Sequence, residues 1–103
     1  MTKLLVLYPP PADADTFERR YREEHAPMVR EKMAGLRRFS AGRVMGAPGG
    51  AAPPFARVAQ LEFDSRDALD AALSSPDGRS VVGHALEIST GGPITALVVE
   101  DDG

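Results

Sequence analysis

The sequence contains no cysteine, which excludes disulfide bonds, thiolate nucleophiles, iron–sulfur clusters and cysteine-type zinc sites. It also lacks a long hydrophobic run, because the opening apolar stretch Leu4–Tyr8 stops at three prolines, Pro9–Pro11. This run is too short for a signal-peptide core or a membrane span, so we expect a cytoplasmic protein. An excess of positive charge is missing too, since the formal net charge is −3 and the pI is about 5.3. That balance argues against nucleic-acid binding, which depends on neutralising phosphates.

The residues that are present are typical of one soluble folded domain spanning residues 1–103. Hydrophobic residues make up 43% of the chain and charged residues 26%, which is enough apolar content for a single modest core. Arginines gather at positions 19–22 and again at Arg37–Arg38. The first group lies among glutamates, so we interpret it as an ion-paired, solvated helix face.

Four stretches have the length and apolar content of β-strands: Leu4–Tyr8, Leu36–Met45, Phe55–Phe63 and Ile94–Val99. In the third stretch the apolar residues at odd positions alternate with Gln60 and Glu62, and only Arg57 and Val58 break the pattern. Gly46–Pro54 contains glycines and prolines without any periodicity. We therefore expect a loop between the second and third strands.

A helix is predicted between the first two strands. It begins at Asp15, with Glu18 three residues later in a capping-box-like arrangement. Pro27 has no N–H and disfavours α geometry at Ala26, so we expect a break in the helix there. The helix resumes through residues 28–33 and ends at Gly35, which suits the C′ position.

A second helix follows the third strand. Asp64 or Ser65 caps it, and Ser75–Pro76 restarts it with serine as N-cap and proline at the first helical position. Its expected inner face comprises Leu69, Ala72, Leu73, Val81, Ala85 and Ile88. The helix ends before Gly91–Pro93, and the acidic tail Glu100–Gly103 is expected to fray.

The order β-α-β-β-α-β predicts an α+β, ferredoxin-like fold, in which two helices cover one face of a four-stranded antiparallel sheet. The first and last strands are apolar on both parities, so both of their faces need to be buried. Helices cover only one face, and a bare apolar second face exceeds what soluble monomers usually tolerate. We therefore infer a homodimer in which two sheets face each other across a partly open cleft.

The predicted first helix carries the strongest candidate for chemistry. Its inner stripe at helical spacing consists of Phe17, Tyr21, His25 and Met28. His25 thus combines an inward position with the expected break at Pro27, and imidazole exchanges protons readily near neutral pH. We predict His25 as acid–base residue with Tyr21 as its polar partner. The alternative is that both are core residues, the histidine hydrogen-bonded and the tyrosine amphipathic.

The other candidate residues concern ligand binding. Gln60 is predicted to orient a substrate, and Met28 and Phe39 to line its pocket together with Met33 and Met45, although core packing explains each of these apolar residues equally well. His84 is interpreted as a surface histidine. No metal-binding spacing links it to His25, and no GxGxxG motif indicates a flavin or nicotinamide site, so we expect no cofactor.

Several segments resemble the EthD family of the dimeric α/β-barrel superfamily: LYPPP, TFERRYREEHAPMV, GLRRF, VAQLEFDS and the GG before the last strand. The resemblance spans nearly the whole chain and implies a ferredoxin-like fold, a sheet-to-sheet homodimer and a reductase-like or small-molecule oxidation role. Related barrels include cofactor-free monooxygenases, lactone isomerases, haem-handling proteins and cyclases. One departure is that His84 stands where the resemblance leads us to expect an aspartate.

Three functional hypotheses follow. In the first, the protein is an enzyme that uses His25 for proton-transfer, isomerase or cofactor-independent monooxygenase chemistry on a small apolar cyclic or aromatic molecule. In the second, the same pocket binds or delivers a metabolite or haem without catalysis. In the third, the protein is a structural dimer whose cleft is filled.

Overall fold

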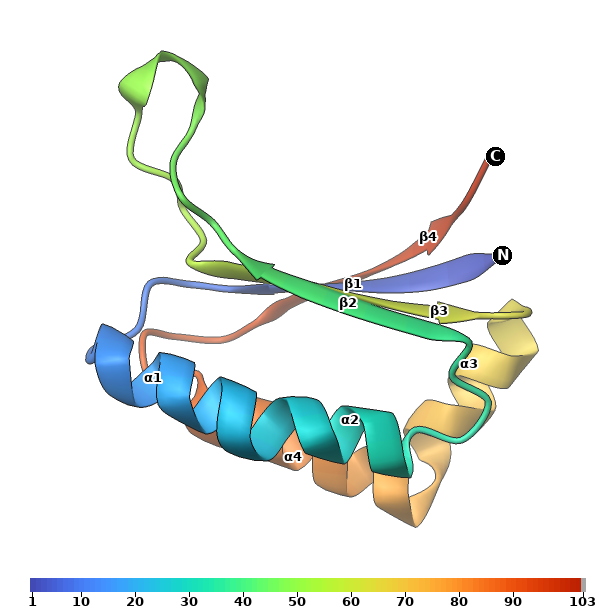
Figure 1. Cartoon of the computed structure of the whole chain (residues 1–103). Coiled ribbons are helices and arrows are strands. Elements are labelled where there is room, and N and C mark those ends of the chain that lie inside the picture. The colour runs from blue at the N-terminus through green and yellow to red at the C-terminus, as the bar shows by residue number, and fades with distance from the viewer. Residues whose placement is uncertain (103) are drawn as a thin grey trace.

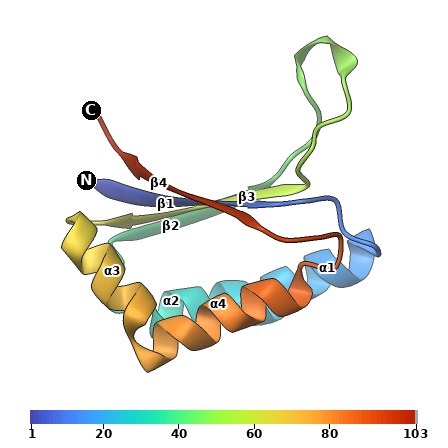
Figure 2. The same cartoon turned by 180° about the vertical axis from the view of Figure 1, so that it is seen from behind.

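The computed structural model describes residues 1–102. The sheet has the order β2-β3-β1-β4, and all neighbouring strands are antiparallel. Its strands are β1 (Thr2–Tyr8), β2 (Arg38–Arg43), β3 (Arg57–Phe63) and β4 (Thr95–Glu100). The helices are α1 (Ala14–Arg20), the π-helical turn η1 (Tyr21–His25), α2 (Ala26–Lys32), α3 (Arg66–Ser74) and α4 (Pro76–Ile88). All of them cover the same face of the sheet (Figures 1 and 2), which confirms the predicted ferredoxin-like α+β fold.

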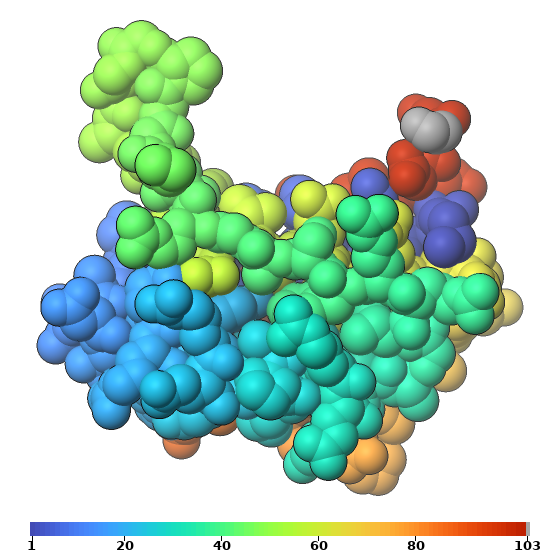
Figure 3. All heavy atoms as spheres, in the orientation of Figure 1, coloured from blue at the N-terminus to red at the C-terminus, as the bar shows by residue number. Residues whose placement is uncertain are grey.

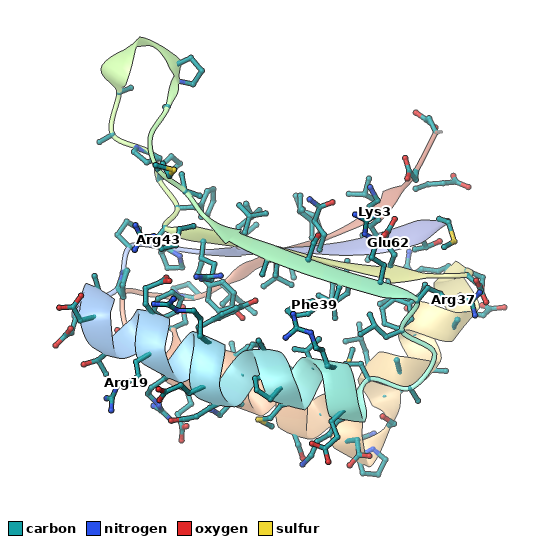
Figure 4. The ribbon with its side chains drawn as sticks, viewed as in Figure 1. Lys3, Arg19, Arg37, Phe39, Arg43 and Glu62 are labelled. Atoms are coloured by element: carbon teal, nitrogen blue, oxygen red, sulfur yellow. The ribbon has the colours of Figure 1, made fainter. Side chains whose placement is uncertain are left out.

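The strand register divides the sheet into two different faces. In β1, Leu4, Val6 and Tyr8 are buried against the helices, and their β3 partners Leu61, Ala59 and Arg57 share that face. The alternate positions point to the helix-free side. Figure 4 shows both directions, with Phe39 pointing from β2 toward the helices and Lys3 and Glu62 on the opposite side.

The strand boundaries differ from the predicted ones mainly around the glycine- and proline-rich loop. β2 ends at Arg43 and β3 begins at Arg57, so Val44–Met45 and Phe55 lie outside the strands. The loop between them contains the short 3-10 turn η2 (Pro48–Gly50) and stands clear of the body (Figure 3). Glu100, expected to fray, closes β4, and Gly103 of the same tail lies outside the described residues.

The expected break at Pro27 is wrong. Ala26 has α-helical angles of φ −59° and ψ −43°, and its N–H donates to the carbonyl of Tyr21, five residues earlier. The extra residue of this π turn lets the helix continue through a position that has no N–H to donate, and Pro27 lies in the first turn of α2. The segment from α1 to α2 is therefore one continuous helical rod (Figure 1).

The helix ends follow local capping chemistry. The first helix is capped by Asp13 and not by Asp15, because the Asp13 carboxylate accepts the N–H of Thr16. The two later caps, Ser65 and Ser75, are confirmed. At the other end, α2 stops at Lys32, and Gly35 adopts a left-handed φ of 84° in the following turn.

Candidate functional site

A cavity of about 240 Å³ lies between the helices and the helix-facing side of the sheet. Its lining consists of Leu4, Val6, Tyr8, Tyr21, His25, Val29, Met33, Phe39, Ala59, Leu61, Leu73, Val81, Val82, Ala85, Ile94 and Ala96. Only Tyr8, Tyr21 and His25 among them carry side-chain oxygen or nitrogen atoms. An apolar cavity with a few polar groups is typical of a small-molecule site, and this volume lies below the ~300–1,000 Å³ of drug-sized sites.

The π turn η1 positions His25 in this cavity. Because η1 contains one residue more than an α turn, the inner face continues from His25 to Val29 and Met33, both buried and both lining the cavity. Met28, predicted on the same stripe, is only partly buried and packs against the core outside the cavity lining. A π turn of this kind is frequent at functional sites.

His25 is the centre of a chain of hydrogen bonds that leads from the cavity to the surface. Its Nε2 lies 3.3 Å from the Tyr8 hydroxyl, and its Nδ1 lies 3.0 Å from Nδ1 of His84 on α4. The other ring nitrogen of His84, Nε2, lies 3.0 Å from Oε1 of Glu24. The side chain of His84 is 13% exposed and that of Glu24 is 47% exposed, so the chain starts in a buried region and ends in solvent.

The electrostatics of the chain keep His25 neutral. Burial, and secondarily the neighbouring His84, lowers the pKa of His25 to about 4. Burial also raises the pKa of Tyr8 well above its ordinary value. At the surface end, the hydrogen bond from His84 and then that from Arg20 lower the pKa of Glu24. At neutral pH this series of hydrogen bonds therefore ends in the Glu24 carboxylate and contains the neutral imidazole of His25 and the neutral phenol of Tyr8.

Tyr21 differs from Tyr8 in that its hydroxyl is buried without a hydrogen-bond partner among the described residues. Burial raises the pKa of Tyr21 to about 12, so the hydroxyl keeps its proton. Its ring lies 5.3 Å from the His25 ring and 4.3 Å below the guanidinium of Arg57. Because a buried unpaired hydroxyl is costly, this group is a ready hydrogen-bond donor for a ligand.

Arg57 anchors this wall of the cavity. It is buried and binds the Glu18 carboxylate with two nitrogens, Nε to Oε2 at 3.2 Å and Nη2 to Oε1 at 2.5 Å. The pair links β3 to α1 one turn before Tyr21. It therefore fixes the first part of the helical rod against the sheet.

The predicted site residues are only partly brought together. Tyr21, His25 and Phe39 line the same cavity, whereas Gln60 pairs with Leu5 on the helix-free face and is not near His25. Met45 is 93% exposed and lines no part of this cavity.

Three residues that matter here were missed or misread. Tyr8 follows from strand parity, since it shares the face of Leu4 and Val6, but only the structure shows its contact with His25. Arg57 looked like an interruption in the alternation of its strand and is instead a buried partner of Glu18. His84 was interpreted as a surface residue, and no local pattern predicts a contact with a residue 59 positions away.

Within residues 1–102, no cluster of three or more histidine, aspartate or glutamate side chains is arranged to hold a metal ion. In the same range, no helix has the length and apolar content needed to span a bilayer.

Comparison with known proteins places this arrangement in a family. The EthD domain matches residues 9–85. The chain belongs to the EthD family. A Rhodococcus erythropolis relative, described as an uncharacterized 11.0 kDa protein in the thcB-thcC intergenic region, is 30% identical over 99% of this chain and 96% of its own length. The structure of an EthD family protein from Bacillus halodurans superposes with a TM-score of 0.91 at 29% identity, covering 98% of each chain.

More distant structures share the fold of this EthD protein. A dimeric ferredoxin-like protein of unknown function from Jannaschia has a TM-score of 0.73 at 17% identity, covering 97% of this chain and 98% of its own. SnoaB, a cofactor-independent oxygenase from Streptomyces nogalater, has a TM-score of 0.67 at 16% identity, covering 99% of this chain and 93% of its own. At these identities the similarity shows the fold alone.

Proposed function

We propose that this EthD protein binds a small, largely apolar cyclic or aromatic molecule in the cavity and catalyses proton transfer on it without a bound cofactor. The supporting observation is the grouping of a neutral buried imidazole and two phenols in an otherwise apolar lining. Apolar side chains take the body of the ligand, and the free Tyr21 hydroxyl donates to its carbonyl or phenol oxygen.

His25 is the proposed acid–base residue. It is neutral at pH 7, so one ring nitrogen is free to accept a proton. The Tyr8 hydroxyl contacts Nε2 at 3.3 Å, longer than the usual range, so a ligand can take its place or exchange a proton through it. Removing a proton next to a carbonyl or from a phenol is the step that isomerisation and cofactor-independent oxygenation share. SnoaB provides a precedent for the second chemistry on this fold.

Proton exchange tests this proposal directly. The probe is 2-indanone, a bicyclic ketone with acidic protons beside its carbonyl, incubated in D2O and followed by proton NMR, with binding measured separately by ligand-observed NMR. We expect the protein to accelerate exchange, and His25→Gln to reduce that acceleration by about 100-fold or more while the ketone still binds. Glu23→Gln, an exposed change in the same turn, serves as the control.

Exchange at the buffer rate for bound ketone, or full acceleration by His25→Gln, contradicts the catalytic role. The first of these outcomes supports the second candidate function, a non-catalytic binding or accessory protein. The low pKa of His25 favours that candidate, because a base works best when its pKa lies near the operating pH. The cavity volume favours a small metabolite over a macrocycle such as haem.

We also infer that the protein works as a homodimer joined through the helix-free face of the sheet. An apolar group on this face extends from β3 across β1 to the edge strand β4 and consists of Leu5, Leu7, Val58, Leu97 and Val99. Leu97 is 49% exposed and Val99 39% exposed, and an ion pair between Lys3 and Glu62 lies beside them. Dimeric proteins of this fold support the inference.

Sedimentation velocity tests the dimer. Leu97→Asp places a charge within this apolar group, so we expect it to shift the protein from dimer to monomer. Leu86→Asp makes the same change at a residue that is 54% exposed on α4, and should leave the dimer intact. A monomeric wild-type protein at micromolar concentration would refute the inference.

A further inference from the structure

His84 and Glu24 have no part in the proposed function so far, although they complete the hydrogen-bonded chain that begins at Tyr8. These hydrogen bonds connect three separate elements, from β1 through η1 to α4, and then return to η1 at Glu24. Each link is 3.0 to 3.3 Å long. The surface end is the charged one, since Glu24 is exposed and also binds Arg20 at 3.1 Å.

The negative charge of the Glu24 carboxylate determines which nitrogens carry protons in the rest of the hydrogen-bonded series. A carboxylate only accepts hydrogen bonds, so Nε2 of His84 has to carry the N–H that faces Glu24. When His84 is neutral, its imidazole has a single N–H, so its Nδ1 is left as an acceptor. The facing Nδ1 of His25 must then donate, and Nε2 of His25 is left bare and accepts from the Tyr8 hydroxyl.

The geometry of the two imidazoles supports a real hydrogen bond between them. The ring planes are parallel to within 7°, with centroids 5.2 Å apart. Stacked rings keep their atoms about 3.5 Å or more apart, whereas the two Nδ1 atoms are 3.0 Å apart. The rings of His25 and His84 therefore meet edge to edge, with the N–H of one directed at the lone pair of the other.

We propose that His84 and Glu24 are positioning residues that hold His25 in its Nδ1-protonated tautomer, with Nε2 as the base toward the cavity, and that they form a proton path to the surface. The catalytic use of this path rests on the proposed function. The tautomer is a property of the resting protein and is independent of any ligand.

The path conserves protons at each step. Nε2 of His25 accepts a proton from the ligand, leaving the ligand one unit more negative, and the Nδ1 proton of His25 moves to Nδ1 of His84. His25 is then neutral again with its N–H on Nε2, and His84 is an imidazolium beside the Glu24 carboxylate. Reversal of both transfers returns a proton to the ligand. The positive charge thus rests on the more exposed, carboxylate-paired ring and not on the buried one.

Nitrogen-15 NMR of the histidine side chains in the ligand-free protein at neutral pH tests the proposal. Ring nitrogens with and without a proton have well-separated shifts, so the tautomer of each histidine is read directly. We expect His25 to be protonated at Nδ1 and bare at Nε2, and His84 to show the opposite pattern.

Two variants test the cause of this arrangement. Glu24→Leu removes the carboxylate, and water at the surface both donates and accepts, so we expect the ratio of the two His25 tautomers to move by about tenfold toward Nε2–H. His84→Leu removes the acceptor of the Nδ1 proton and should produce a larger change in the same direction. Glu23→Leu, an exposed substitution one residue earlier, should leave the tautomer unchanged.

Wild-type His25 protonated at Nε2 overturns the proposal, and so does an unchanged tautomer in both Glu24→Leu and His84→Leu. A heteronuclear correlation spectrum of the backbone amides checks that each variant is folded. Because no ketone is present, a failed exchange experiment leaves this result standing, and a failed tautomer prediction leaves the catalytic role of His25 to be decided by exchange.

Discussion

Tyr8 and Arg57 are directly opposite each other in β1 and β3, yet they belong to two different kinds of polar connection across the core. Arg57 binds Glu18 through an ion pair that is nearly enclosed, with side chains 7% and 13% exposed. Tyr8 binds His25, and this connection passes from a neutral phenol and a neutral imidazole through His84 to Glu24 at the surface. The first link holds a fixed geometry, whereas the second can move a proton from the buried His25 ring to the more exposed His84 ring.

The two connections therefore have different roles in the helical rod: one fixes its position, and the other serves the cavity. Glu18 fixes the first part of the rod on the sheet, and one turn later Tyr21 and His25 reach the cavity. A buried ion pair contributes mainly to position, because two guanidinium nitrogens hold both oxygens of the carboxylate. A series of hydrogen bonds that includes a neutral phenol and a neutral imidazole is able to transfer protons.

The largest loss of stability should come from removing one partner of the ion pair between Arg57 and Glu18. Arg57→Leu leaves the Glu18 carboxylate buried without its partner, so we expect a loss of about 3–5 kcal/mol in the free energy of unfolding, measured by urea titration with circular dichroism. Replacing both partners by leucine should recover most of that loss. Arg66→Leu, which breaks an exposed pair with Asp70, should cost less than about 1 kcal/mol. Equal losses for Arg57→Leu and Arg66→Leu would contradict the contrast between buried and exposed pairs.

Lowering the pH should destabilise the protein because of the buried, neutral His25. The folded pKa of His25 is about 4, below its ordinary value of 6.5, so between these pH values the unfolded chain binds more protons than the folded one. Stability therefore rises with pH through this window and is lost as the pH falls through it. Between pH 7 and pH 4 we expect the wild type to lose about 3 kcal/mol more than His25→Gln, measured by urea titration at each pH. Parallel pH profiles for the two proteins would mean that His25 titrates normally.

The fold could be predicted from the sequence because it depends on local signals that repeat along the chain. Alternation in β3, the serine caps at Ser65 and Ser75, and the apolar character of β1 and β4 each depend on neighbouring residues. The π turn could not be predicted in this way, because the proline rule describes how an α-helix ends and not how an inserted residue lets it continue.

The site could be predicted only in part. His25 and Tyr21 follow from helical periodicity, and Phe39 from its apolar character, but the partners of His25 come from β1 and α4 and depend on how these elements pack. Gln60 shows the limit of the reasoning from parity, since parity assigned it correctly to the face opposite Leu61 but could not tell which face holds the cavity. The burial of Arg57 could not be predicted, because a charged residue is placed on an apolar face only when its ion-pair partner is known.

The smallest expected change in stability is the difference between removing the Tyr8 hydroxyl and removing the Tyr21 hydroxyl. Tyr8→Phe removes a hydroxyl that is bonded to His25, so we expect a loss of about 1 kcal/mol in the free energy of unfolding. Tyr21→Phe removes a buried hydroxyl that has no hydrogen-bond partner within residues 1–102, so the stability of the variant should stay equal or rise. Its affinity for 2-indanone should fall, because the donor for the carbonyl is gone. Urea titration and ligand-observed NMR on both variants provide the two readouts. A destabilised Tyr21→Phe that binds the ketone normally would show that the hydroxyl supports the fold and not the ligand.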